Sequence, residues 1–518
     1  DSLFNRNSKT ATNRRLTIEF TSNPAWYAVQ ALPAMNLPKN DNAISWATAY
    51  YANSVASFIV NSQPRIKTLF DSWRATGGNK DTFMSRLQKN QDVKNILIEE
   101  TPWLSQATSE AEQMARIATL FDLNNLSNNN IAALTKLKDL QNANGSWSWC
   151  KGMNGGFSMT AYIAELLIRL PLLTGSANSN KAQQMLQSAW TYLHSEANRE
   201  YKAILRAKDK GEKNDLISSS ALTYMYLLAV SGEKVPSTNE EACRYYLSLV
   251  GKNLMGSSIC FKSYAAVILH KNGRTAEAKD YVNSIKEHLI KTSERGAYFA
   301  FSERPYLWGM LPVSIHVGAM DALRYVEGNT YLLEEMKLWL LKQKQTTNWN
   351  SPVTDADAVY ALLCQGTNLL AESGNVSIKL GNKVIDTTSP SVQSTAGFGY
   401  VKEVFDGDSP VVRAKSVTVT KRDEGAAWGA VYAQYLEDIS AVKQLGSELN
   451  VEKKLYVQHS LANGKSELQP ISPSTILNVG DKVVSRLTIR LDRAMDFVQL
   501  KDQRAACFEP EFTLSGYQ

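Results

Sequence analysis

The sequence has 518 residues and lacks the features that mark several common protein classes. Its five cysteines are odd in number, widely separated and never in C-x-x-C spacing, so neither a disulfide framework nor a zinc site is predicted. No run of five or six like charges occurs, and the net charge of +6 is small for this length. Nucleic-acid binding is therefore not expected, and no metal or cofactor is predicted.

Long apolar runs are also scarce. The most apolar stretch, residues 164–173, contains Glu165, Arg169 and Pro171 and falls short of the roughly 18 to 20 residues that span a bilayer. We therefore expect no transmembrane segment in this chain. The first residues show no charged-then-apolar signal pattern, and the chain begins with Asp1. We expect either that a leader was removed or that the sequence is a piece of a longer protein.

The chain does have an ordinary globular composition, with 44% hydrophobic and 20% charged residues, and its length suits more than one domain. Between about residues 24 and 370 the apolar residues recur with helical spacing. Ile163, Leu166, Leu167 and Leu170, for example, follow i, i+3, i+4, i+7. Asn-Gly and Ser-Gly turn signals separate these stretches. The pattern predicts helical hairpins in series, arranged either as a solenoid or as a closed ring.

Two segments of the helical region are similar to each other. In the first, Gln141 ends a helical stretch and the following turn carries Gly145 and Trp147; in the second, Gln345 and Trp349 follow in the same order. A tryptophan in such a turn can pack between neighbouring hairpins, and the glutamine can hydrogen-bond exposed groups at the helix end. We predict that this repeat motif is structural. It resembles the motif of α/α-toroid proteins, which are rings of helical hairpins.

After about residue 371 the apolar residues alternate with a period of two, which is typical of β-strands. The stretches that alternate are residues 376–380, 416–420, 429–435, 454–457 and 487–491. The C-terminal portion is therefore predicted to be all β, as one or two sandwiches. Residues 15–20 also alternate, and we expect them to pair with the later strands. The predicted fold class is multidomain α+β, an α/α toroid of helical hairpins followed by antiparallel β-sandwich domains.

Several longer phrases of the sequence resemble, in the same order, the C-terminal portion of the bacterial alpha-2-macroglobulin family. They are residues 16–33, 50–53, 145–149, 344–349, 357–363, 427–432 and 500–510. The resemblance implies a thioester-domain-like toroid with flanking β domains. It divides the chain into a β segment at 1–22 that pairs with the later β domain, the toroid at 23–370, a CUB-like β domain at 371–440 and a macroglobulin-like β-sandwich at 441–518, either incomplete or naturally short.

Family members that act covalently carry Cys-x-Glu-Gln near the start of the toroid, where the cysteine sulfur and the glutamine side-chain carbonyl form an internal thioester. Counted from the resembling run at 50–53, the corresponding positions are Asn42, Ala43, Ile44 and Ser45. None of them supplies a thiol, and the first cysteine of the chain is Cys150. The alignment therefore predicts degenerate thioester positions, no thioester and no catalytic residue.

Other candidate sites have a simpler structural interpretation. Asp355-Ala-Asp357 resembles half of an acidic cyclase motif, but it lies at a predicted helix start, where Thr354 or Asp355 is a natural N-cap. His316 precedes a helical stretch and is more typical of a structural histidine than of a ligand or base. No base accompanies Cys150 in the sequence, so a packed or half-exposed thiol is favoured over a reactive one.

The resemblance implies a fragment of an exported cell-envelope protein, either periplasmic or anchored to the outer membrane, that engages proteases and is not an enzyme. Without a thioester, inhibition would be non-covalent, by steric trapping. Other envelope proteins are further candidate partners. Two alternatives stay open: a glycan-active enzyme, because α/α toroids also host glycosidases, and an envelope interaction module anchored by Trp147 and Trp149.

Overall fold

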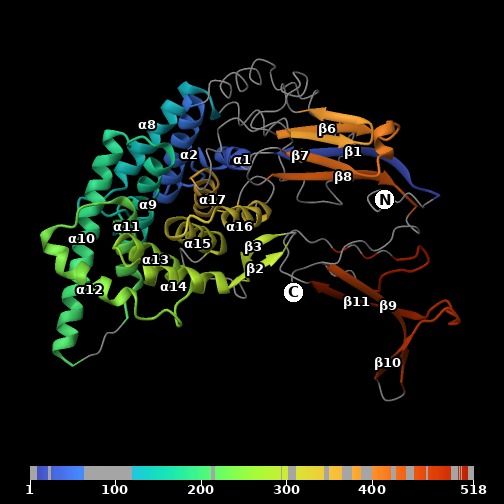
Figure 1. The fold of residues 1–518 in the computed structure, drawn as a ribbon. Coiled ribbons are helices and arrows are strands. Elements are labelled where there is room, and N and C mark those ends of the chain that lie inside the picture. The colour runs from blue at the N-terminus through green and yellow to red at the C-terminus, as the bar shows by residue number, and fades with distance from the viewer. Residues whose placement is uncertain are drawn as a thin grey trace. The chain divides into compact units, whose positions relative to one another are not determined.

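The computed structural model describes residues 9–21, 25–62, 120–211, 216–292, 295–300, 311–343, 349, 351–364, 376–386, 400–421, 427–438, 449–461, 465–491, 500, 502 and 504–511. The chain forms two compact units. The described helices and strands β1–β8 belong to the first unit, and strands β9–β11 belong to the second (Figure 1).

Among the described helices, one set forms a closed inner ring. Its members are α2 (Ala43–Ser62), α9 (Phe157–Thr174), α11 (Ser219–Ser231), α13 (Ile259–Lys271), α15 (Pro312–Val326) and α17 (Pro352–Cys364). Each packs against the next one in chain order, and α17 packs back against α2. The series of hairpins therefore closes into a ring and does not extend as an open solenoid.

An outer set of helices covers this ring, and each outer helix makes its most extensive helix–helix contact with one inner helix. The outer helices are α1 (Ala25–Met35) on α17, α8 (Leu123–Asp139) on α2, α10 (Asn180–Asp209) on α9, α12 (Glu240–Val250) on α11, α14 (Thr275–Glu287) on α13 and α16 (Thr330–Gln343) on α15. Inner and outer helices alternate along the described chain, so successive inner helices run in the same direction. The predicted fold class, a helical toroid with β domains after it, is confirmed (Figure 1).

Local sequence signals explain where the helices begin and end. Helix α11 is an example: the Ser218 hydroxyl accepts a hydrogen bond from the Ala221 backbone N–H at 3.0 Å, and Gly232 follows the last turn with a φ of 69°. Burial then separates the two helix sets. Inner helix α9 is buried at nearly every position from Thr160 to Leu170, whereas outer helix α10 buries one stripe.

Helix α9 is also, among the described residues, the one helix long and apolar enough to cross a membrane by length and composition. It is 18 residues long because the apolar pattern begins at Phe157, before the stretch that stands out in the sequence. The helix packs against α2, α10, α11 and α17 in the first unit. Its apolar surface therefore lies in the protein core.

Trp147 lies in the turn between α8 and α9 and is fully buried. Its indole N–H donates to the Leu137 carbonyl of α8 at 2.9 Å. The Gln141 side-chain amide donates to the Gly145 carbonyl at 3.1 Å and to the Met185 carbonyl of α10 at 2.9 Å. The turn thus ties the end of one outer helix to the N-terminal part of the next.

Gly145 is required by the same turn. Its φ is +89°, which lies in the left-handed region, and a Cβ atom added there would lie 1.9 Å from the backbone carbonyl oxygen of Ser188 on α10. Any larger residue would therefore push the turn away from α10.

Trp349 occupies a similar position after α16. It is also buried, and its indole N–H donates to the Leu340 carbonyl of that helix at 2.7 Å. Gln345, the other member of the second predicted motif, lies outside the described residues. Both tryptophans thus bond a carbonyl in the last turns of the outer helix that precedes them.

The β-strands of the first unit form two small antiparallel sheets. In one, β1 (Thr12–Thr21) lies between β6 (Tyr400–Asp406) and β8 (Trp428–Leu436); in the other, β4 (Val376–Leu380) lies between β5 (Lys383–Asp386) and β7 (Val417–Lys421). Leu16, Ile18 and Phe20 of β1 share one core with Val376 and Ile378 of β4. The N-terminal strand thus joins strands that follow the helical ring in sequence, with Leu16 opposite Phe405.

The helical region contains one feature that its periodicity does not predict. Strands β2 (Leu289–Thr292) and β3 (Gly296–Phe299) pair antiparallel between α14 and α15. The expectation of an essentially all-helical region was wrong here. The strands are only four residues each, too short for a period of two to stand out. Gly296, with a φ of +69°, approaches the Glu335 carbonyl of α16 so closely that a Cβ atom would lie 2.1 Å from it.

In the second unit, β9 (Leu449–Ser460) is the central strand of an antiparallel sheet, flanked by β10 (Ser466–Pro470) and β11 (Lys482–Leu491). The register places Tyr456 opposite Val484 and Val457 opposite Val483. Most side chains of the three strands are half-buried or exposed.

We predict that Trp147→Ala destabilises the chain by about 3 to 5 kcal/mol, because it removes a fully buried indole. Trp149→Ala, two residues further on, is the matched control, since the Trp149 side chain is 45% exposed and its loss leaves no cavity. The measurement is the unfolding midpoint of both variants in denaturant. Equal shifts for the two variants would contradict the proposed role of the turn.

Candidate functional site

The four residues predicted from the sequence to be degenerate thioester positions lie at the start of inner helix α2. Asn42 is buried, and its Oδ1 accepts a hydrogen bond from the Ser45 backbone N–H at 2.9 Å, which caps the helix. Ala43 and Ile44 are buried in the first turn. The Ala43 N–H donates to the Trp149 carbonyl at 3.1 Å. These positions therefore form a helix cap that is bonded to the first tryptophan turn.

The fold brings Cys150 to the same place. Its Sγ lies 3.9 Å from the carbonyl oxygen of Asp41, the residue before the cap. The thiol is half-buried, as expected from the sequence, and it is free, like the other four cysteines. Sequence reasoning did not predict this proximity because 109 positions separate the two residues.

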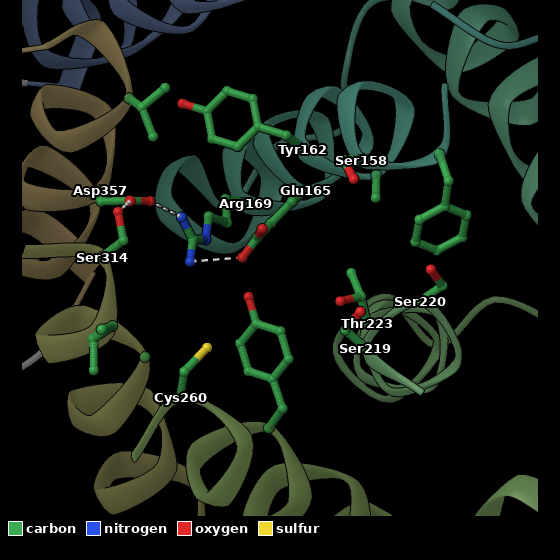
Figure 2. A pocket seen from close by; sticks show the side chains of 16 residues that line it. Ser158, Tyr162, Glu165, Arg169, Ser219, Ser220, Thr223, Cys260, Ser314 and Asp357 are labelled. Carbon is green, nitrogen blue, oxygen red and sulfur yellow. Dashed lines mark hydrogen bonds and ion pairs between the residues drawn. The ribbon is translucent and has the colours of Figure 1, made fainter. Parts of the chain in front are cut away.

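The ring encloses a cavity of about 190 Å³ (Figure 2). Its walls come from α9, α11, α13, α15 and α17, and each of these helices contributes at least one residue of its first turn. The lining residues are Phe157, Ser158, Ala161, Tyr162, Glu165, Arg169, Ser219, Ser220, Thr223, Cys260, Tyr264, Ser314, Ile315, Gly318, Val353 and Asp357. The N-termini of five inner helices therefore converge on one polar cavity.

A buried charge triad lies at the floor of this cavity. The Arg169 guanidinium contacts Asp357 Oδ1 of α17 at 2.5 Å and Glu165 Oε1 of its own helix at 2.7 Å. The Ser314 hydroxyl of α15 donates to Asp357 Oδ2 at 2.6 Å, and the guanidinium lies 4.5 Å from the ring centre of Tyr360. Asp357 is thus bonded on both oxygens, whereas Glu165 pairs, among the described residues, with the guanidinium alone (Figure 2).

Two polar atoms of the triad have no hydrogen-bond partner among the described residues. Glu165 Oε1 forms an ion pair with Arg169 but lacks the alignment of a hydrogen bond, and Arg169 Nε has no acceptor. The hydroxyl of Tyr51, which reaches the same region from α2, is likewise unpaired. Burial raises the pKa of Glu165 to about 7 against the opposing effect of Arg169. Burial also raises the pKa of Tyr51 well above its usual value.

The structure corrects the N-cap interpretation of the Asp355-Ala-Asp357 sequence. Helix α17 begins at Pro352, and the Ser351 hydroxyl accepts from the Thr354 N–H at its start. Asp355 does not cap this helix; its carboxylate accepts from the Trp349 N–H at 2.5 Å and so holds the second tryptophan turn. The sequence could not reveal the pairing of Asp357 with Arg169, because 188 positions separate them.

A second buried carboxylate near the triad is neutralised separately. Asp321 of α15 accepts hydrogen bonds from Arg324 at 3.0 Å, from the Tyr360 hydroxyl at 3.2 Å and from the Tyr226 hydroxyl at 3.4 Å. These bonds join α11, α15 and α17. Asp321 therefore contributes to the cohesion of the ring.

The described histidines lie away from the cavity. His316 is fully buried, its Nε2–H donates to the Met336 carbonyl at 3.0 Å, and it packs 4.3 Å from the Trp339 ring. Burial lowers its pKa to about 3, so the ring is neutral, in agreement with a structural role. Within the described residues no cluster of three metal-ligating side chains occurs.

Residues 449–518 match the family model of the bacterial alpha-2-macroglobulin MG10 domain. This match confirms the resemblance to the bacterial alpha-2-macroglobulins. Comparison of the sequence with curated proteins gives no match. The helical region lies outside the matched residues, so its assignment to the thioester domain stays a prediction from the sequence motifs.

Solved structures of alpha-2-macroglobulins are similar at low identity. An Escherichia coli fragment from domain MG7 to the C-terminus matches 93% of this chain at 13% identity with a TM-score of 0.39. The Salmonella protein reacted with methylamine matches 93% of this chain at 13% identity with a TM-score of 0.37. The trypsin-activated Escherichia coli protein matches 95% of this chain at 11% identity with a TM-score of 0.40. This chain spans 61%, 25% and 26% of those three chains.

We predict that the stability of the wild type relative to Glu165→Gln falls as the pH rises from about 4.5 to about 7. The folded state holds the Glu165 proton more tightly than the unfolded state, so deprotonation favours unfolding across this range. Denaturant unfolding of both proteins at several pH values measures the difference. Glu287→Gln, on the exposed surface of α14, controls for the loss of one carboxylate. A stability of the wild type relative to Glu165→Gln that increases with pH would contradict the raised pKa of Glu165.

Proposed function

We propose that this chain is part of an exported bacterial alpha-2-macroglobulin-like protein of the cell envelope that inhibits proteases without a covalent bond. The MG10 match at residues 449–518 is the observation that carries the proposal. The Escherichia coli relatives include forms activated by porcine elastase and by trypsin, which supports proteases as the partner class. Its role would be to restrict the access of a bound protease to large substrates.

The helix cap at residues 42–45 supports a non-covalent mode of action. An internal thioester needs a cysteine thiolate and a glutamine side-chain carbonyl close together. Here the Asn42 side chain is bonded to the Ser45 N–H, and no cysteine precedes Cys150 in the chain. We propose that these residues stabilise the start of α2 and hold it against the first tryptophan turn.

The proposed domain division follows the family resemblance. Residues 1–22 would form a β segment, 23–370 the thioester-domain-like toroid, 371–440 a CUB-like domain and 441–518 a macroglobulin-like sandwich. Pairing of β1 with β6 supports assignment of the N-terminal segment to the β domain that follows the toroid.

The ring cavity gives weaker support to an enzyme. Glycoside hydrolysis needs one carboxyl group as acid and a second carboxylate free to act on a water or on the sugar. Asp357 is held by Arg169 and Ser314, so it is not free for either role. We therefore propose a non-enzymatic protein, with the tryptophan turns as internal supports.

We predict that the chain does not incorporate methylamine. Intact-mass spectrometry after incubation with methylamine should show no added mass. Thiol titration of the unfolded chain should find all five cysteines both before and after the treatment, because none is held in an acyl bond. A thiol that appears only after methylamine treatment would overturn the non-covalent mechanism.

We also predict protection of bound protease from large substrates. The full-length protein that contains this chain is incubated with a protease, and cleavage of a short chromogenic peptide is compared with cleavage of a large protein substrate. Only the second reaction should slow. Pretreatment with methylamine is the matched control and should change neither rate. Unchanged cleavage of the large substrate would exclude the trapping role.

A further inference from the structure

The walls of the ring cavity differ in chemistry. Ser158 and Ser219 are exposed at its edge, and Ser220 and Thr223 are half-buried further in. In Figure 2 these four hydroxyl residues lie together on one side of Glu165, and Asp357 and Ser314 lie on the other. Thr223 is one turn into α11. The cavity is therefore open to polar groups on one side and bounded by the charge triad on the other.

Aromatic rings complete the enclosure. Phe157 and Tyr162 of α9 and Tyr264 of α13 all line the cavity. The Tyr264 ring is stacked on that of Tyr226 at a centroid distance of 4.0 Å, which fixes its orientation. Ring faces combined with a few directed polar groups are the usual composition of a small-molecule site.

The floor of the cavity has unused hydrogen-bonding capacity. Glu165 is 8% exposed, and its Oε1 has no hydrogen-bond donor among the described residues. Arg169 is 6% exposed, and its Nε has no acceptor. A buried polar atom without a partner destabilises a protein unless something supplies the missing bond. A ligand with hydroxyl groups can both donate to Glu165 and accept from the cavity wall.

Charge balance excludes strongly charged occupants. Two carboxylates share one guanidinium at the floor, so an anion would meet an uncompensated negative charge. The N-termini of five helices border the cavity, and their dipoles disfavour a cation. Protonation of Glu165, whose pKa is about 7, neutralises the triad without any counter-ion. The cavity is thus suited to an uncharged, polyhydroxylated ligand.

We infer that the ring cavity binds one uncharged sugar ring, with a hydroxyl group directed at Glu165 and others directed at Ser158, Ser219, Ser220 and Thr223. Its volume of about 190 Å³ is below the range of drug-sized sites and suits a single pyranose. The sugar ring could come from a free monosaccharide or from the end of a glycan chain. This site is independent of protease binding, and its failure would leave the proposed inhibitory function untouched.

Ligand-observed NMR on the whole chain tests this inference. The probes are glucose, galactose and N-acetylglucosamine, with glycine and inorganic phosphate as the charged comparison. Saturable binding of at least one sugar is expected, with Thr223→Val weakening it about 3- to 10-fold through loss of one hydrogen bond. The matched control is Thr191→Val, an exposed threonine on outer helix α10, which should bind like the wild type.

The outcomes separate cleanly. Tighter binding of an N-acetylglucosamine trimer than of the monomer supports a glycan end as the source, and equal binding supports the free sugar. Ser220→Ala is a second variant with the same expected direction, and circular dichroism verifies that each variant is folded. No saturable sugar binding, binding of glycine or phosphate alone, or sugar binding that is unchanged in both cavity variants would overturn the inference.

Discussion

The contact between Arg169 and Asp357 sets the central constraint on the helical ring. It joins α9 to α17, which are neighbours only because the last inner helix returns to the first ones. A buried guanidinium without its carboxylate would leave an uncompensated charge in the core, which is strongly destabilising. The two helices must therefore meet at one axial position. Glu165 and Tyr360 add contacts to the same guanidinium, and Ser314 bonds the other oxygen of Asp357.

The same triad explains why the ring contains a polar cavity. Burial raises the pKa of Glu165, and among the described residues its Oε1 has the Arg169 ion pair but no hydrogen bond. Inner helices that run in one direction bring their first turns together, and serine and threonine are common in first turns because they bond backbone N–H groups. Charge at the floor and hydroxyls at the wall are therefore two consequences of one ring topology.

The tryptophan turns and the helix cap at Asn42 act at the periphery of the ring. Each buried indole donates to a carbonyl of the outer helix before it, and Gly145 allows the turn to approach α10. The Trp149 carbonyl then accepts from Ala43 at the start of α2. The predicted thioester positions are thus linked by a backbone hydrogen bond to the first tryptophan turn, and Asn42 among them caps the helix.

The sequence alone determined the helical and β regions and the absence of any cysteine before Cys150, because residue spacing and composition are local properties. It did not reveal β2 and β3, the pairing of Asp357 with Arg169 or the approach of Cys150 to Asp41. Only the tertiary structure decided these. Closure of the ring brings together residues more than a hundred positions apart, and no local pattern encodes which distant helices become neighbours.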